Sequence, residues 1–418
     1  MPEAVIVAHR RSPIGRAFKG SMTELRADDL TATIVQSALD RVPELDPKDL
    51  VDLHLGCGLP GGEQGFNMAR VVAVLLGYDQ LPGVTLTRYC SSSLQTTRMA
   101  FHAIKAGEGD AFISAGVEMV SRYGKGNSDA LPAEAQQMVG QWTNPRFTAS
   151  VERTLQRSQD GEAETWRDPR EHDDLPELPD IYIAMGQTAE NVAQIKGISR
   201  EEQDEFAYRS QTLYGKAQAN GFWEREIEPI TLPDGETMSE DDSPRPDTSL
   251  EKIGELQPVF RPDGTVTAGN ACPLNDGAAA VVVMSDTKAR ELGLQPIARI
   301  VATGVSALNP EIMGLGPVEA SRQALSNAGM AIDDVDLVEI NEAFAAQVIP
   351  SARELGIDID KLNVNGGSIA VGHPFGMTGA RITGTLLNSL DFHDKTIGLE
   401  TMCVGGGQGM AMIVERLS

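Results

Sequence analysis

The sequence has 418 residues, which is enough for about two to four domains that each bury a core. Its apolar share of 41% is that of a globular protein and not of a disordered one. A net charge of -25 argues against a surface for nucleic acid or for anionic membranes, but 35 Lys and Arg residues remain to line a local pocket for an anionic ligand.

The four cysteines, Cys57, Cys90, Cys272 and Cys403, lie far apart and form no C-x-x-C pair. With only 6 histidines, this usage indicates neither a metal site nor a disulfide framework, and it is typical of a reducing cytosol. The first eight residues are too short an apolar run for a signal peptide, and no run reaches the length of a membrane span. We therefore expect a soluble cytoplasmic protein.

The first 120 residues alternate between strand and helix signals. Short apolar or β-branched runs predict strands over residues 4–8, 51–55, 84–87 and 110–116. Helical spacing predicts helices over residues 28–41 and 67–76, and a third that ends at residue 106. This alternation predicts an α/β fold with a mixed sheet covered on both faces.

Residues 121–258 interrupt the alternation and are rich in Asp, Glu, Gln, Pro and Arg. Within them we predict one helix that begins near Ala184 and a second that follows the capping box Ser199–Glu202. Residues 160–179 have the composition of a mobile acidic loop. We interpret the segment as an inserted helical subdomain that can form a lid, and a solvated surface excursion is the alternative.

Beyond a glycine-rich turn at residues 265–277, the α/β pattern resumes as a repeat of the first half. The matching pairs of segments are 38–55 with 324–340, the turn around Cys90 with the turn around His373, and 111–119 with 397–405. The repeat predicts a pseudo-twofold duplication with an N-terminal domain at 1–288 and a C-terminal domain at 289–418. Such a fold brings Cys90 and His373, each expected at a strand-to-helix turn, to a common site.

These two turns carry reactive side chains. Cys90 opens a helix, where unpaired N–H groups and the helix dipole stabilise a thiolate, so we predict a nucleophile. His373 lies among the glycines of residues 365–381, which give a substrate close access and indicate a catalytic base. The alternatives are a small buried hydrophobe for Cys90 and a core histidine for His373.

Two further segments add polar groups to the predicted site. Cys403 precedes a run in which four of the five residues from Gly405 are glycine, so that the Gly405 amide can face a developing oxyanion. The phosphate-loop pattern G-x-x-x-x-G-K-[ST] is absent there. Residues Asn341–Phe344 follow a predicted strand and reach the same sheet edge, although a helix cap is the alternative.

Taken together, these motifs resemble those of the thiolase family. Asn-Glu-Ala-Phe at 341–344, Gly-His-Pro at 372–374, Cys-x-Gly-Gly-Gly at 403–407 and the Cys90 turn are spread over nearly the whole chain. The resemblance implies a duplicated, five-layered αβαβα fold with an inserted helical loop domain over the active site. It also implies a homotetramer built from tight dimers that acts on CoA and acyl-CoA thioesters, with no metal or redox cofactor.

The resemblance further implies a role for each matched residue. Cys90 would be the acylated nucleophile, His373 the base that activates Cys90 and the CoA thiol, and Cys403 the acid/base at the acetyl carbon. Asn341 would act through a water to help His373 hold the thioester oxygen, and the amides of Cys90 and Gly405 would form a second oxyanion hole. The implied CoA and acyl pocket is lined by Met185, Phe260, Ala271, Cys272, Met313, Ala343 and Phe344.

Three positions depart from the family pattern. Ser93 replaces the usual Gly behind the nucleophile, which predicts an altered acyl pocket. Ala184 stands where acetoacetyl-specific members have His, and Cys272 stands where Ser is common. These departures favour a 3-ketoacyl-CoA thiolase of broader chain length, of the kind used in fatty acid β-oxidation. The alternatives are an acetoacetyl-CoA-specific biosynthetic acetyltransferase, a decarboxylating ketoacyl synthase, and a non-catalytic acyl-CoA or sterol-binding relative.

Overall fold

The structure is a computed structural model that describes residues 2–125, 144–161 and 164–418. In this part of the chain one sheet follows the order β10-β11-β12-β9-β1-β8-β5-β3-β4, with β2 paired to β8. Its strands are β1 (Ala4–Arg11), β2 (Gly15–Arg16), β3 (Asp52–Cys57), β4 (Gly83–Leu86), β5 (Ala111–Met119), β8 (Asn275–Ser285), β9 (Ala298–Ala307), β10 (Leu337–Ile340), β11 (Ile397–Val404) and β12 (Gln408–Arg416).

The sheet consists of two similar halves joined at a narrow seam. β1 pairs with β8 along its length, but with β9 only at Val5 and Ile6. Each half contains a parallel pair, β3 with β5 and β10 with β11, as the repeat predicts. β10 leads directly into Asn341 and β11 into Gly405, and β4, which pairs with β3, leads into the Cys90 turn.

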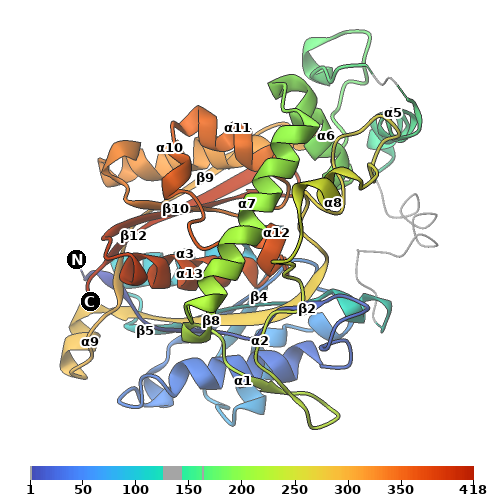
Figure 1. Ribbon diagram of the computed structural model, residues 1–418. Helices are drawn as coiled ribbons and strands as arrows, with labels where there is room; N and C mark the ends of the chain where they lie inside the picture. The colour runs from blue at the N-terminus through green and yellow to red at the C-terminus, as the bar shows by residue number, and fades with distance from the viewer. Residues whose placement is uncertain (1, 126–143, 162–163) are drawn as a thin grey trace.

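The helices separate the two halves and cover their outer faces. Figure 1 shows α10 and α11 above the C-terminal strands, α3 and α13 between the halves, and α1 and α2 below the N-terminal strands. The predicted duplicated αβαβα fold with five layers is confirmed. The helices of the two halves are α1 (Ala27–Leu39), α2 (Met68–Leu75), α3 (Ser92–Ala106), α9 (Asp286–Glu291), α10 (Gly316–Ala328), α11 (Ala345–Leu355), α12 (Ser368–Val371) and α13 (Thr378–Phe392).

Strand β8 shows why the layers hold together. All eleven of its residues are buried, and its side chains alternate between two hydrophobic clusters. Val282 and Met284 face the cluster under α1 and α2, whereas Val281 and Val283 face the central cluster around α3 and α13. A strand buried on both faces is expected to be continuously apolar, as this one is over most of its length.

The prediction of a strand before the His373 turn is wrong. β4 precedes Cys90, but the equivalent place before His373 has only an isolated bridge between Val338 and Leu362, followed by the single turn of α12. The side chain of Asn363 explains the difference. It bonds both the N–H and the carbonyl oxygen of Ile340, each at 2.9 Å, and thereby takes the place of a neighbouring strand.

The insertion is helical, as predicted. It contains α5 (Thr148–Gln159), α6 (Met185–Lys196), α7 (Arg200–Ala219), α8 (Leu250–Gly254) and the short pair β6 (Ile230–Thr231) and β7 (Thr237–Met238). The capping box of Ser199 and Glu202 is present at the start of α7. Residues 126–143 of the predicted lid, and 162–163 of the acidic loop, lie outside the described residues. The rest of that loop is irregular, with the Trp166 indole donating to Glu311 at 2.6 Å.

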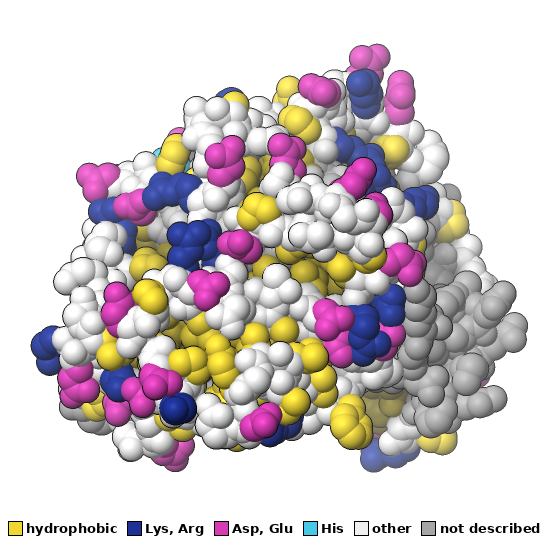
Figure 2. Space-filling view, turned by 90° about the horizontal axis from the view of Figure 1, so that it is seen from below, with side chains coloured by type: hydrophobic (Ala, Val, Ile, Leu, Met, Phe, Trp, Pro, Cys, Tyr) yellow, Lys and Arg dark blue, Asp and Glu magenta, His cyan; other side chains and the backbone are white. Residues whose placement is uncertain are grey.

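Charged side chains of both signs are spread over the surface. On the face shown in Figure 2, acidic and basic residues are interspersed, with apolar side chains between them. A nucleic-acid surface instead gathers Lys and Arg on one face. None of the helices in the described ranges has the length and apolar character needed to cross a bilayer.

Candidate active site

The turns of the two halves meet at the centre of the molecule. Cys90 lies in the short 3-10 turn Tyr89–Ser91 between β4 and α3. This turn contacts β11, which carries Cys403, and α13, which follows the His373 turn. Asn341 follows β10 directly, and its side chain reaches His373. The structure therefore brings the four predicted catalytic side chains together.

The Cys90 thiol is a protonated group faced by two amides. Its pKa is raised to about 12, chiefly by burial and also by the carboxylate of Glu118, although the backbone amides of Gly405 and of Cys90 itself lower it. The predicted stabilisation of a thiolate by the helix N-terminus is therefore outweighed by burial. Attack by Cys90 requires a base that takes the thiol proton. The two amides converge on the sulfur, which is where an oxyanion hole for its acyl adduct belongs.

His373 has the tautomer that such a base needs. The hydroxyl of Thr378 donates to the carbonyl oxygen of Pro374 at 2.7 Å and lies 2.6 Å from Nδ1 of His373. A hydroxyl has a single hydrogen, so Nδ1 carries the ring proton and donates it to Thr378. Nε2 is then unprotonated. Burial and the charge of Arg381 lower the pKa of His373 to about 3, which keeps the ring neutral at pH 7.

Asn341 contacts this ring directly. Its Nδ2 lies 3.2 Å from Nε2 of His373. The Asn341 backbone N–H donates to the carbonyl oxygen of Thr401 in β11 at 3.0 Å. The amide nitrogen of Asn341 and Nε2 of His373 thus face each other, and the backbone of Asn341 is tied to β11, the strand that carries Cys403.

Cys403 is buried in β11 close to Cys90. Burial raises the pKa of its thiol well above the usual range, and the thiols of Cys90 and Cys272 raise it further. Cys403 is therefore a neutral thiol at pH 7, able to give a proton to a carbanion. The charge of Cys90 contributes to the raised pKa of Cys272, which indicates that the two sulfurs lie near each other.

Glu118 holds the His373 turn to the N-terminal half. This fully buried carboxylate at the end of β5 accepts hydrogen bonds from the backbone of Gly58 at 2.7 Å and of Gly376 at 2.8 Å, and from the Tyr123 hydroxyl at 2.7 Å. A Cβ at residue 376 would lie 2.3 Å from the Val117 carbonyl oxygen, so only glycine permits this approach. The carboxylate thus links the two halves beside the nucleophile.

The residues predicted to line the CoA and acyl pocket lie together in one apolar cluster, here called the apolar wall. All seven of its residues belong to the hydrophobic cluster that contains Cys403: Met185, Phe260, Ala271, Cys272, Met313, Ala343 and Phe344. The rings of Phe260 and Phe344 pack edge to face with centroids 6.2 Å apart. Ala271 forms an isolated bridge with Phe344, which joins the 265–277 turn to the Asn-Glu-Ala-Phe segment.

Ser93 does not shape this wall, contrary to the prediction from its replacement of Gly. Its side chain is fully buried between α3 and α13, and its hydroxyl accepts the backbone N–H of Ala380 at 2.8 Å. The second residue of α3 faces the central layer and not the pocket. Ala184, the other departure near the pocket, is the exposed N-cap of α6 and contributes no cap hydrogen bond.

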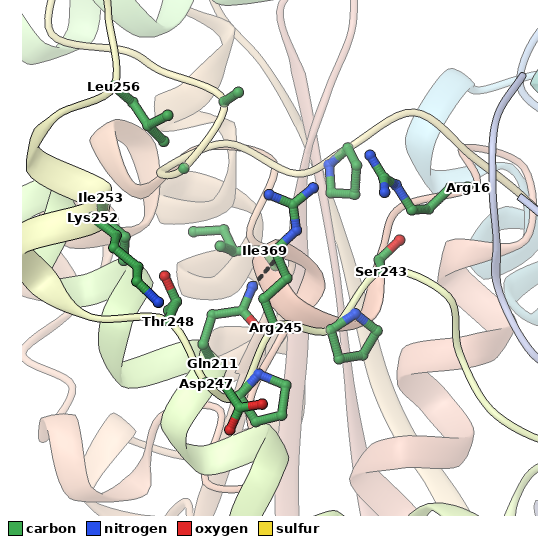
Figure 3. A pocket seen from close by; sticks show the side chains of 15 residues that line it. Arg16, Gln211, Ser243, Arg245, Asp247, Thr248, Lys252, Ile253, Leu256 and Ile369 are labelled. Atoms are coloured by element: carbon green, nitrogen blue, oxygen red, sulfur yellow. Dashed lines mark hydrogen bonds between the residues drawn. The ribbon is translucent and has the colours of Figure 1, made fainter. Parts of the chain in front are cut away.

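A cavity of about 550 Å³ lies beside the turn that carries Cys272. Ala268, Gly269 and Pro273 line it, and these residues belong to the same turn as Cys272. Its charged lining consists of Arg16, Arg245, Lys252 and Asp247. Figure 3 shows the guanidinium of Arg245 in the middle of the cavity, with Lys252 and Arg16 on opposite sides. The lining thus carries a net positive charge in a protein of net charge -25.

Comparison with known protein families identifies the family to which this chain belongs. The family model described as the thiolase N-terminal domain matches residues 4–287, and the model of the thiolase C-terminal domain matches residues 294–416. The chain belongs to the thiolase family. As a thiolase it is an acyltransferase, and relatives of the same name extend over its full length.

Among these thiolases, the 3-ketoacyl-CoA thiolase of Bacillus subtilis is 40% identical, over 99% of this chain and 100% of that protein. The beta-ketoadipyl-CoA thiolase of Pseudomonas aeruginosa is 42% identical, over 97% of each chain. Of the solved structures, the acetyl-CoA acetyltransferase of Bacillus anthracis has a TM-score of 0.83 and 39% identity, and the match covers 100% of this chain and 99% of that one.

Several site residues of this thiolase are missing from the sequence-based prediction. Glu118 had a usable signal, because an acid within the apolar run 111–119 needs a buried partner. Thr378 lies in the glycine-rich stretch around His373 but has no pattern of its own. Of the three cationic residues of the cavity, Arg16 lies more than 200 residues before Arg245 and Lys252, so no local motif joins them.

Proposed function

We propose that this thiolase cleaves 3-ketoacyl-CoA with CoA to give acetyl-CoA and a shortened acyl-CoA, and that it also catalyses the reverse condensation. The observation that carries the proposal is the set of groups gathered around the Cys90 turn, which contacts α13 and β11: a neutral His373 with a fixed tautomer, two backbone amides and the protonated thiol of Cys403. This set supplies a nucleophile, a base, an oxyanion site and an acid.

The proposed reaction begins when Cys90 gives its proton to Nε2 of His373 and its sulfur attacks the 3-keto carbon. The bond between C2 and C3 then breaks, and its electron pair passes to C2 as the enolate of acetyl-CoA. Cys403 protonates C2, which releases acetyl-CoA and leaves the shortened acyl group on Cys90. A new CoA thiol gives its proton to the Cys403 thiolate and attacks this thioester. The departing Cys90 sulfur takes back its proton from His373, which restores both thiols and the neutral imidazole. No metal or redox cofactor takes part.

We further propose that the cationic cavity holds the phosphates of CoA. Arg16, Arg245 and Lys252 supply the opposite charge, and the turn that lines the cavity leads through Cys272 toward Cys90. The human mitochondrial 3-ketoacyl-CoA thiolase, with 34% identity and a TM-score of 0.82, has a structure in complex with CoA. That precedent supports CoA as a ligand of this chain.

The acyl wall favours an aliphatic 3-ketoacyl chain. Met185, Phe260, Met313 and Phe344 are apolar, so a terminal carboxylate buried against them would lose hydration without gaining a partner. A 3-oxoadipyl-CoA substrate is the second candidate, because relatives with 41–42% identity are named beta-ketoadipyl-CoA thiolases.

The test is CoA-dependent cleavage by the purified protein of acetoacetyl-CoA, longer 3-ketoacyl-CoA substrates and 3-oxoadipyl-CoA. We expect kcat/KM to rise from acetoacetyl-CoA to a maximum at a longer aliphatic chain, and to be at least about 10-fold lower for 3-oxoadipyl-CoA, since one buried unpaired carboxylate costs more than 1.4 kcal/mol. A maximum at 3-oxoadipyl-CoA would select the second candidate. No cleavage of any substrate by the folded protein would refute thiolysis.

We also propose that two copies of the chain associate through the edge strand β4. β4 ends the sheet, so one row of its backbone groups lacks a strand partner within the described chain. Phe66, Val74 and Leu75, from the segment just before β4, are at least 50% exposed. Sedimentation equilibrium at assay concentrations is expected to give a dimer, or a tetramer of two such dimers. A monomeric protein that is fully active would contradict this.

A further inference from the structure

A chain of buried polar side chains runs behind the active site and ends at His373. Nη2 of Arg381 lies 2.6 Å from the Ser368 hydroxyl, which lies 2.5 Å from Oδ1 of Asn341. Nδ2 of Asn341 then lies 3.2 Å from Nε2 of His373. All four residues are at most 2% exposed, so water does not compete for these hydrogen bonds.

The direction of each hydrogen bond follows from the guanidinium. Arg381 has only donors, so the Ser368 oxygen accepts from it. The single hydroxyl hydrogen of Ser368 is then free for Oδ1 of Asn341, which can only accept. The other end of the amide, with its two N–H groups, must point toward Nε2 of His373 and the space beside it. The chain thereby fixes an orientation that an isolated Asn side chain would leave open.

The opposite orientation of Asn341 is strongly disfavoured. It would place Nδ2 against a hydroxyl that already accepts from Arg381, and Oδ1 against the lone pair of Nε2. The second lone pair of the Ser368 oxygen could still accept from Nδ2, but the Ser368 hydroxyl hydrogen and Nε2 of His373 would both lose their partners, and buried polar groups that lose their partners each cost about 1–3 kcal/mol. One amide orientation therefore dominates as long as Ser368 and Arg381 are present.

The free-energy cost of burying the Arg381 guanidinium indicates that its charge has a role in the site. Among the described residues no carboxylate lies within ion-pair distance of it, and its Nε and Nη1 have no hydrogen-bond partner. The nearby acids Glu339 and Glu400 are themselves buried, and burial raises the pKa of each to about 8. Burying a cation without a direct counter-ion costs free energy. The Arg381 side chain nevertheless donates a hydrogen bond to Ser368.

We propose that Ser368 and Arg381 are positioning residues for the thiolase reaction, which hold the amide of Asn341 with its N–H groups toward His373 and the substrate oxygen. This inference rests on the proposed function. In this orientation Asn341 can donate to a thioester or enolate oxygen that develops charge beside Nε2, and in the flipped orientation it would repel that oxygen. Neither Ser368 nor Arg381 touches the substrate.

The first test is Ser368→Ala, which removes the link between Arg381 and Asn341. We expect kcat for thiolysis to fall about 10- to 100-fold, up to the value of one lost oxyanion-hole donor. The KM for CoA should stay within about twofold, because the cationic cavity is unchanged. Ser351→Ala is the matched control: it deletes an equally buried hydroxyl, on α11, whose partner is the Gly314 carbonyl oxygen and not Asn341.

A double-mutant cycle separates positioning from a general structural role. If Ser368 acts through Asn341, Ser368→Ala should cost nothing further once Asn341→Ala is present. Additive losses, or a Ser368→Ala enzyme as active as wild type, would overturn the proposal. Should Ser368→Ala fail to fold, Arg381→Lys takes its place in the same cycle with the same two criteria. An inactive wild type would refute the proposed function instead, so the two failures are distinguishable.

Discussion

Replacement of Cys90 by alanine is expected to abolish turnover while the fold is retained. The side chain is small and partly accessible, so its loss leaves only a minor cavity. The acyl thioester, however, cannot form without the sulfur, and loss of a nucleophile costs about 10⁴-fold or more in kcat. Steady-state thiolysis and the mass of the protein after incubation with 3-ketoacyl-CoA would measure both effects.

Cys57→Ala provides the matched control for this variant. Cys57 is a fully buried thiol at the end of β3 whose sulfur donates to Glu118 at 3.7 Å and not to a histidine, so it has neither the base nor the access that a nucleophile needs. We expect an activity within about twofold of wild type for Cys57→Ala, because the lost volume is small. Appreciable turnover or an acylated protein in Cys90→Ala would remove Cys90 from its proposed role.

The catalytic turns were predictable because the sequence patterns that encode them span only a few neighbouring residues. Cys90 stands in a strand-to-helix turn, His373 in a glycine-rich turn and Cys403 at the end of a strand that leads into one, and such turns are encoded by neighbouring residues. The repeat of strand and helix signals then indicated that the turns meet at one place. The fold and the set of facing groups thus followed from local pattern together with one global symmetry.

The remaining features depend on where side chains point. The missing strand before His373 results from Asn363, whose side chain imitates a strand, and nothing in its sequence neighbourhood announces this. Ser93 is a serine in a helix start, and only the packing of α3 on α13 decides that it faces Ala380. The pKa of Cys90 likewise depends on burial, which competes with the helix dipole and here exceeds it.

The Cys403→Ser variant is expected to separate the two halves of the reaction. Transfer of an acyl group from acyl-CoA to Cys90 needs Cys90, His373 and the amides, so the variant should still form acyl-enzyme, although slowly. Condensation needs removal of an α-proton from acetyl-CoA. A serine hydroxyl is a far weaker acid than a thiol and is a poor proton shuttle, so condensation should fall by about 10²- to 10⁴-fold.

Exchange of the α-hydrogens of acetyl-CoA with deuterium from solvent measures this step alone. Cys272→Ser is the informative comparison, because Cys272 is the other buried thiol whose pKa responds to Cys90. That variant should keep the exchange and alter mainly the KM for CoA, since Cys272 lines the pocket wall. If Cys272→Ser lost the exchange and Cys403→Ser kept it, the acid/base role would belong to Cys272. The two thiols would then exchange their proposed roles, while Cys90 would remain the nucleophile.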